Sequence, residues 1–394
     1  MQNKEYKKLF TKLKLKNFLL KNRFVLSPIT LNVSTKNGIA TKKDYDYALK
    51  RAHSAPLAIT TAANINKEGR LFEFSLAADR TKNISSLSKL ALAMKNKGAK
   101  AILQLTHSGR YSIATQKKLN YVVGPSEKKL NFPIQHTVKE LKIREIKKII
   151  RDYEKATLVA IKAGFDGIEI SSAQKLLLQT FFSKNENQRT DLYGTQNLLN
   201  RSRISLEVFR AVQKVIKENA DDNFILGYRA TPEEIVGQDV GYNFDEFLEF
   251  MTLLLKEVQI DYLALASWGK KIYLSKVRTF SKKYYGMLWT EAIKKHFKNK
   301  INLMINGGIS SYEDCIEAIK HADLIGLSSV FIVEPDFVNK IKNQQLDKIN
   351  LKISKKDLKK LAIPKKAFKK IEIMLDYSAS IPEVTRDFFK KNNK

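Results

Sequence analysis

A strand–helix alternation that repeats along most of the 394-residue chain is the strongest constraint on its fold. Short apolar or β-branched runs of strand length recur, and longer amphipathic segments lie between most of them. Parallel strands joined by helices form either an open doubly wound sheet or a closed barrel. Eight strands favour the barrel, and the absence of a GxGxxG motif after any of them argues against a dinucleotide-binding open sheet. The expected strands are residues 23–28, 57–63, 101–105, 167–171, 224–229, 261–267, 301–307 and 323–329, and the expected helices are 43–52, 84–98, 144–164, 203–218, 244–258, 290–297 and 311–322.

The composition allows a large buried core and indicates a cytoplasmic protein. Hydrophobic residues make up 43% of the chain, which is enough for a large buried core. The single cysteine, Cys315, excludes an internal disulfide and fits a reducing cytosol. The N-terminus is charged and lacks the apolar core of a signal peptide, and no apolar run reaches the length of a membrane span. We therefore expect a cytoplasmic protein without a membrane span.

The formal net charge of +31 has two interpretations. Clustered lysines would indicate a nucleic-acid partner, because they release counterions from phosphates. Here the lysines are spread along the whole chain, often on the outer faces of expected helices, so a Lys-rich composition is the simpler explanation. We expect no nucleic-acid partner. The five histidines have no metal-ligand spacing, so we also expect no metal site.

Polar residues gather where the expected strands end. The active site of a (β/α)8 barrel lies at the C-terminal ends of its strands. Acids are nearly absent from these ends, which argues against metal-dependent hydrolysis and against the carboxylate pair of a glycosidase. The residues at the strand ends are Ser27–Thr30, Thr61–Ala63, Gln104–Arg110, Ser171–Gln174, Arg229, Ser267–Trp268, Asn306–Gly308 and Ser328–Ser329.

The ends of the last two strands are suited to a phosphate group. Gly307 and Gly308 leave backbone N–H groups open to an anion, and Ser328 and Ser329 add hydroxyls. The loops after strands seven and eight are a frequent phosphate site in this fold. A tight turn that requires glycine is the alternative explanation of the Gly-Gly pair.

A phosphate tail beside a polar, uncharged rim fits flavin mononucleotide (FMN). The flavin ring needs hydrogen bonds at its edge and a positive charge near N1 and O2, where negative charge gathers on reduction. Gln104 and Arg229 are expected on neighbouring strands and offer both. An arginine stays protonated at any working pH.

Several motifs together resemble the old yellow enzyme family, which includes NADH:flavin oxidoreductases and 12-oxophytodienoate reductases. The resemblance covers residues 8–345, and the irregular RTDLYG…NRSR element after the fourth strand is its most specific part. It implies an α/β fold, namely a single-domain (β/α)8 TIM barrel over residues 8–345 that binds FMN, with a long loop after the fourth strand. Residues 346–394 lie outside it, and we expect a basic, Lys-rich C-terminal helical tail there. The motifs are KNRFVLSPIT, NKEGRLF, LQLTHSGR, AGFDGIEI, NQRTDLYGTQNLLNRSRISLEV, GYRATPEE and INGGIS followed by ADLIGL.

The resemblance also implies roles for single residues. Thr30 would hydrogen-bond the flavin O4 and tune its potential, and Arg229 would face N1 and O2. For Thr30 and Ala62, packing at a strand end is the alternative explanation. Arg229 is the least ambiguous, because a buried arginine needs a partner. The implied FMN-binding residues are Ser27, Pro28, Ile29, Thr30, Ala62, Gln104, Arg229, Gly307, Gly308, Ser328 and Ser329.

The chain departs from the family pattern at the fourth and eighth strands. The family places His-x-x-His or His-x-x-Asn where this chain has Ser171 and Gln174, and those side chains hold the carbonyl of an enone substrate. Leu176 stands where the family has the proton-donating tyrosine. The Ser328–Ser329 pair replaces a Gly-Arg pair, so one positive charge at the phosphate is lost.

These residues predict an FMN-dependent NAD(P)H oxidoreductase that passes hydride through FMN to an electrophilic acceptor. Ser171, Gln174 and Thr30 are the expected catalytic residues. With Leu176 in place of tyrosine, the proton would come from solvent or from another side chain such as Tyr111. NADH and NADPH remain equal alternatives. The acceptor would be a small molecule or a group attached to a protein.

Two other functions remain open at this point. The first is a flavin-binding barrel whose ene-reductase activity has drifted or been lost, acting on an unusual acceptor or as a binding module. The second is a basic barrel that binds nucleic acid without a flavin, which the net charge of +31 alone suggests.

Overall fold

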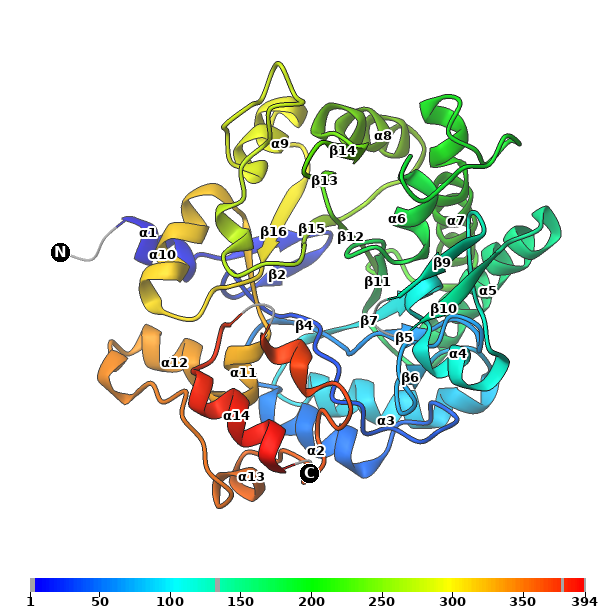
Figure 1. Ribbon diagram of the computed structural model, residues 1–394. Coiled ribbons are helices and arrows are strands. Elements are labelled where there is room, and N and C mark those ends of the chain that lie inside the picture. Colours follow the sequence, from blue (N-terminus) through cyan, green and yellow to red (C-terminus); the bar gives the residue numbers. More distant parts are fainter. Residues whose placement is uncertain (1–3, 132–134, 377–378, 393–394) are drawn as a thin grey trace.

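A closed barrel of parallel strands forms the centre of the computed structural model, which describes residues 4–131, 135–376 and 379–392 (Figure 1). Each strand pairs in parallel with the next, and the last pairs with the first, so the predicted (β/α)8 barrel is confirmed. The strands in barrel order are β3 (Phe24–Leu26), β4 (Leu57–Ile59), β7 (Lys100–Thr106), β11 (Gly167–Ser171), β12 (Ile225–Ala230), β15 (Tyr262–Leu265), β16 (Asn302–Asn306) and β17 (Leu324–Leu327).

The second strand is shorter than the sequence predicts. β4 ends at Ile59, and Ala63–Asn64 form a separate strand, β5, that pairs with the end of β7 and with β6 (Leu76–Ala77). The Thr60 hydroxyl accepts the backbone N–H of Gln104 at 3.1 Å in place of a strand ladder bond. An apolar run at the rim therefore continues as an irregular turn and not as one strand.

The predicted helices are present and cover the outside of the barrel. Their apolar stripes face the strands, and asparagine or serine caps begin three of them: Asn197 accepts the N–H of Asn200, Asn243 accepts that of Glu246, and Ser311 accepts that of Asp314. Cys315 is buried beneath the last of these caps. The helices are α2 (Lys42–Arg51), α3 (Ile84–Lys95), α5 (Ile143–Lys162), α7 (Leu198–Asn219), α8 (Phe244–Glu257), α9 (Trp289–Phe297) and α10 (Tyr312–His321), and α11 (Ser329–Val333) and α12 (Phe337–Lys342) follow β17.

The barrel interior is apolar at its N-terminal end. A hairpin of β1 (Leu13–Leu15) and β2 (Phe18–Leu20) closes that end, and the sequence did not predict it. Its inward leucines join a cluster of strand residues that are almost fully buried, so the bottom of the barrel is a packed core and not a channel. The buried members are Leu15, Leu20, Val25, Leu57, Ile59, Ile102, Ile225, Tyr262, Ala264, Met304 and Leu324.

Two further excursions, also unpredicted, stand on the C-terminal face. A small sheet of β8 (Val122–Gly124), β9 (Lys128–Leu130) and β10 (His136–Glu140) lies between β7 and α5, and a hairpin of β13 (Glu234–Val236) and β14 (Asp239–Tyr242) follows β12. The small sheet rests on the long loop after β11, which contains α6 (Leu177–Phe182).

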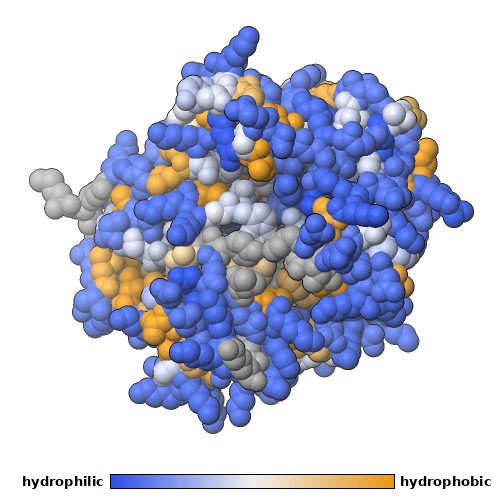
Figure 2. All heavy atoms as spheres, viewed as in Figure 1, coloured by the Kyte–Doolittle hydropathy of each residue, from blue (hydrophilic) through white to orange (hydrophobic). Residues whose placement is uncertain are grey.

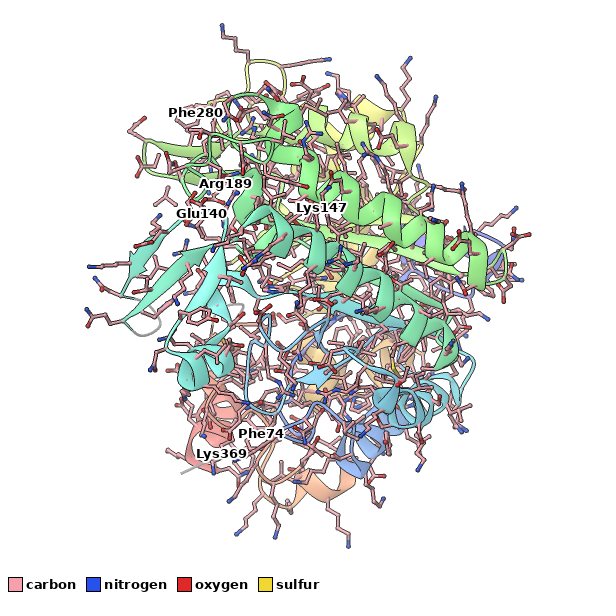
Figure 3. All side chains as sticks on the ribbon, turned by 90° about the vertical axis from the view of Figure 1, so that its right-hand side faces the viewer. Phe74, Glu140, Lys147, Arg189, Phe280 and Lys369 are labelled. Atoms are coloured by element: carbon pink, nitrogen blue, oxygen red, sulfur yellow. The ribbon has the colours of Figure 1, made fainter. Side chains whose placement is uncertain are left out.

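Arg189 of the RTDLYG element joins the long loop to the small sheet. Its guanidinium pairs with Glu140 at 3.1 Å and donates to the carbonyls of Pro125 and Leu141 (Figure 3). It also pairs with Asp191 two residues ahead. This side chain is 4% exposed, so the motif that makes the family resemblance specific is a structural clamp beside the barrel mouth.

The C-terminal tail packs back onto the barrel. Its described residues include two α-helices, α13 (Asp357–Lys360) and α14 (Glu383–Asn392), and two short 3-10 helices, Leu346–Lys348 and Glu372–Asp376. Its apolar residues form a second core with Leu31 and Tyr47, while most of its lysines stay exposed. The tail lies beside α2 and α11 in Figure 1, and Arg51 joins all three by donating to the carbonyls of Phe331, Ile332 and Leu361.

His107, just after β7, is a buried neutral histidine. It is 1% exposed, its Nδ1 accepts the backbone N–H of Gly109 at 3.1 Å, and a Cβ on Gly69 would lie 2.6 Å from its ring. Burial, with a smaller effect of Lys148, lowers the pKa of His107 from 6.5 to about 3.

We expect His107 to make the folded state sensitive to acid. Its folded-state pKa is lower than its unfolded-state value, so its contribution to stability is complete above pH 6.5 and is lost as the pH falls toward about 3. The lost stability approaches about 1.4 kcal/mol per pH unit. In the variant His107→Gln, the free energy of unfolding in urea should therefore fall less steeply between pH 6.5 and pH 5 than in the wild type.

His53→Gln removes a more exposed imidazole and is the matched control. A His107→Gln protein with the full acid sensitivity of the wild type would contradict the assignment.

Candidate active site

The barrel mouth brings the predicted strand-end residues together. In the strand register, Ser171 of β11 lies opposite Arg229 of β12, and Glu169 of β11 lies opposite Gln104 of β7. Gln104, Ser171 and Arg229 are each less than a tenth exposed. Three predicted residues therefore share one end of the barrel interior. The expectation that Gln104 and Arg229 lie on neighbouring strands is wrong, because β11 lies between β7 and β12.

A buried carboxylate, which the sequence did not predict as a site residue, lies among these strands. Glu169 is fully buried; it accepts a hydrogen bond from Gln104 Nε2 at 2.7 Å and another from the hydroxyl of Tyr262 at 3.1 Å. Burial raises the pKa of Glu169. The positive charge of Arg229 and the hydrogen bonds from Gln104 and Tyr262 lower it in part. The signal in the sequence was GIEIS itself, since an acid inside an otherwise apolar barrel strand needs buried partners.

Room for this network comes from a glycine on β12. A Cβ at Gly227 would lie 2.2 Å from the ring of Tyr262, so any larger residue would push the phenol away from Glu169. The hydroxyl of Tyr262 would then lose its carboxylate partner inside the barrel.

Arg229 retains hydrogen-bonding capacity that the described residues do not use. Its Nη1 is buried and has no hydrogen-bond partner among them. Burial lowers the pKa of Arg229, and Glu169 raises it again. A buried guanidinium N–H without an acceptor costs free energy, so this atom is a place for an acceptor oxygen or nitrogen of a ligand.

The ends of β3 and β4 add hydroxyl groups to the mouth. The Thr61 hydroxyl donates to the Thr30 hydroxyl at 3.1 Å, which brings the predicted flavin contact Thr30 next to the second strand. The Ser27 hydroxyl donates to Oδ1 of Asn306, another strand-end residue, at 2.5 Å. Gly326 makes this bond possible, because a Cβ there would lie 1.8 Å from Asn306 Oδ1.

The Gly307–Gly308 turn packs against the loop that follows β15. Both glycines have left-handed backbone angles, with φ of 95° and 89°. A Cβ on Gly308 would lie 1.7 Å from the carbonyl oxygen of Lys270, and the backbone N–H of Tyr273 donates to the Gly307 carbonyl. Glycine is therefore required here by the chain itself.

The two serines after β17 flank the start of α11. Ser328 is partly buried and precedes the helix, whereas Ser329 is its first residue and is 4% exposed. They directly follow β17, and its paired neighbour β16 leads into the glycine turn. The two sequence elements predicted to bind phosphate are thus neighbours.

The predicted acceptor pocket contains hydroxyl and amide groups. Ser171 is buried, and Gln174 and Lys175 both have left-handed backbone angles, with φ of 61° and 63°. The backbone N–H of Gln174 donates to the Thr231 hydroxyl at 3.1 Å, which fixes this turn to β12. Leu176 directly precedes α6. No side chain at positions 171, 174 or 176 exchanges a proton near neutral pH.

Lys175 is a charged residue near this pocket that the sequence analysis did not single out. Its Nζ lies 3.7 Å from Glu186 and 3.6 Å from Glu234, and the side chain is 28% exposed. Arg110 also pairs with Glu186. These opposite charges therefore pair with one another beside the turn of Gln174.

The described residues contain no group of three side chains suited to hold a metal ion. Among the same residues, no helix is long and apolar enough to cross a bilayer. Figure 2 shows mostly hydrophilic side chains on the viewed face, with hydrophobic ones in separate patches.

Proteins of known family are similar to this chain in sequence and in fold. Residues 8–348 match the model of the NADH:flavin oxidoreductase / NADH oxidase family. An uncharacterised oxidoreductase of Streptococcus pyogenes is 48% identical, over 94% of this chain and 93% of its own. The NADH:acrylate oxidoreductase of Vibrio harveyi is 30% identical over 83% of this chain but only 32% of its own.

Among solved structures, morphinone reductase in complex with tetrahydroNAD superposes with a TM-score of 0.69 and 26% identity, over 85% of this chain and 90% of its own. The family match spans most of the chain and includes every residue at the barrel mouth. The chain therefore belongs to the NADH:flavin oxidoreductase / NADH oxidase family and is an FMN-dependent NAD(P)H oxidoreductase of the old yellow enzyme type.

Proposed function

We propose that the barrel mouth binds FMN with the flavin edge at Arg229 and Gln104, and that hydride passes from NAD(P)H through FMN to an electrophilic acceptor held by Ser171 and Gln174. The observation behind this proposal is the unpaired Nη1 of buried Arg229. A flavin offers N1 and O2 as acceptors for such a donor, and reduction places negative charge there. FMN, when bound, supplies the hydride-transfer chemistry.

Glu169 positions the two residues that face the flavin edge. Its carboxylate accepts from Gln104 and attracts Arg229, so both side chains are oriented before a ligand arrives. Groups oriented in advance stabilise developing charge without reorganising.

Thr30, with Thr61 beside it, is proposed to contact the flavin at O4. The Thr61 hydroxyl donates to Thr30, which leaves the Thr30 hydroxyl proton available for another acceptor. A single donor at O4 would favour the reduced ring and raise its potential.

The acceptor pocket would orient a polar substrate without protonating it. Ser171 and Gln174 each offer a donor, and Leu176 offers none. A proton for the substrate carbon then comes from solvent. We therefore propose weak activity on simple enones and better activity on acceptors that need no enzyme acid.

A second candidate is transfer to an acceptor carried by another protein or domain. This chain matches about a third of the length of the Vibrio harveyi acrylate oxidoreductase, so in that relative a similar unit is joined to further sequence. The lack of an acid at position 176 suits an acceptor that takes electrons without protonation by the barrel.

The purified protein should be yellow and should release about one FMN per chain. Under anaerobic conditions, addition of NADH or NADPH should bleach the flavin absorbance. The mass of the released chromophore distinguishes FMN from riboflavin. Bound FMN that neither nucleotide bleaches would disprove the proposed reaction.

Restoring the family's acceptor groups should increase enone reduction. The variant Ser171→His/Gln174→Asn/Leu176→Tyr should reduce 2-cyclohexenone about 10²-fold faster than the wild type, since one well-aimed donor contributes that much in other enzymes. The rate at which NAD(P)H reduces the flavin provides the internal control and should change little. An unchanged enone rate would show that the pocket differs by more than these side chains, and would favour the protein-attached acceptor.

A further inference from the structure

The phosphate end of the proposed FMN site lacks an arginine. Ser329 occupies the position at which the family pattern has one, and Ser328 and Ser329 offer hydroxyls without charge. A phosphate monoester carries a charge between −1.5 and −2 near neutral pH, as phosphorylated side chains do. A positive group elsewhere at this end of the barrel would have to replace the arginine.

The loop after β15 lies directly against the glycine turn. A Cβ on Gly308 would overlap the carbonyl oxygen of Lys270 at 1.7 Å and approach the Cα of Lys271 at 2.9 Å. The N–H of Tyr273 donates to the Gly307 carbonyl at 3.3 Å, and Ile272 is buried beneath the turn. The backbone of Lys270 and Lys271 is therefore fixed beside Gly307 and Gly308.

Both lysine side chains are exposed and uncommitted. Within the described part of the chain, neither forms a salt bridge or a side-chain hydrogen bond, whereas many lysines elsewhere do, such as Lys294 with Asp323 at 2.8 Å. A lysine has a flexible four-carbon stem, so its ammonium group can turn toward an anion at the neighbouring turn. Lysine also binds phosphate well as a point charge.

We propose that Lys270 and Lys271 supply the positive charge for the FMN phosphate in place of the missing arginine. The inference rests on the proposed FMN site and adds its phosphate-binding residues. The Gly307–Gly308 turn and the Ser328–Ser329 hydroxyls provide neutral donors, and the lysines of the adjacent loop provide the charge. In this arrangement the cation comes from the loop after β15 and not from the start of α11.

Comparing FMN with riboflavin tests the proposal, because riboflavin lacks only the phosphate. Apoprotein would be titrated with each flavin, and the loss of flavin fluorescence would give both dissociation constants. For the variant Lys270→Gln/Lys271→Gln, the FMN dissociation constant should rise at least about tenfold, while that of riboflavin stays unchanged. High salt should reduce the difference between the wild type and the variant.

The matched control is Lys298→Gln/Lys300→Gln, which removes two exposed lysines at the opposite, N-terminal end of β16. It lowers the net charge equally and should leave both constants unchanged. An equal loss of FMN affinity in the control would mean that overall charge is responsible, and would overturn the proposal. Equal weakening of FMN and riboflavin in the test variant would also overturn it, since the loop would then act only on the fold.

A rescue variant separates charge from loop structure. Ser329→Arg, added to the Lys270→Gln/Lys271→Gln background, should recover FMN affinity relative to riboflavin. Wild-type protein that binds neither flavin would instead refute the proposed FMN site itself. Wild-type protein that binds FMN and riboflavin equally would refute the lysine assignment alone.

Discussion

The buried polar groups of Glu169, Gln104, Tyr262 and Arg229 determine what the barrel mouth can do. Two opposite charges lie inside a barrel that is otherwise filled with apolar side chains, and each would be costly to bury alone. Gln104 and Tyr262 donate hydrogen bonds to Glu169. The Nη1 donor of Arg229, however, has no acceptor among the described residues. The fold thus tolerates this network while leaving one strong donor for a ligand.

The barrel interior has an apolar layer that stabilises the fold and a polar layer at the mouth that can bind a ligand. Mainly leucine, isoleucine and valine fill the N-terminal half, together with Tyr262, Ala264 and Met304, and the β1–β2 hairpin closes it. Polar side chains begin one layer higher, at the level of Gln104 and Glu169. Because the apolar layer and the outer helices stabilise the barrel, residues at the mouth can differ from the family without loss of the fold. Ser171, Gln174, Leu176 and Ser329 are such differences.

The loops on the C-terminal face depend on one another. Arg189 fixes the long loop to the small sheet, and Arg51 fixes the tail to α2 and α11. Asn32, with φ of 57°, accepts from the N–H of Phe74 and donates to the carbonyl of Lys369, and Figure 3 shows Phe74 and Lys369 near each other. These contacts join segments up to 337 residues apart in the sequence.

The sequence by itself determined the strand–helix alternation, the barrel and the set of strand-end residues, because hydrophobic periodicity is a local property. It also determined the absence of an acid at positions 171, 174 and 176. Only the tertiary structure decided that Glu169 accepts a hydrogen bond from Gln104 and affects the pKa of Arg229, that the tail packs on α2, and that Lys270 and Lys271 adjoin Gly308. Those facts depend on strand register and on contacts between distant segments, which no local pattern in one sequence specifies.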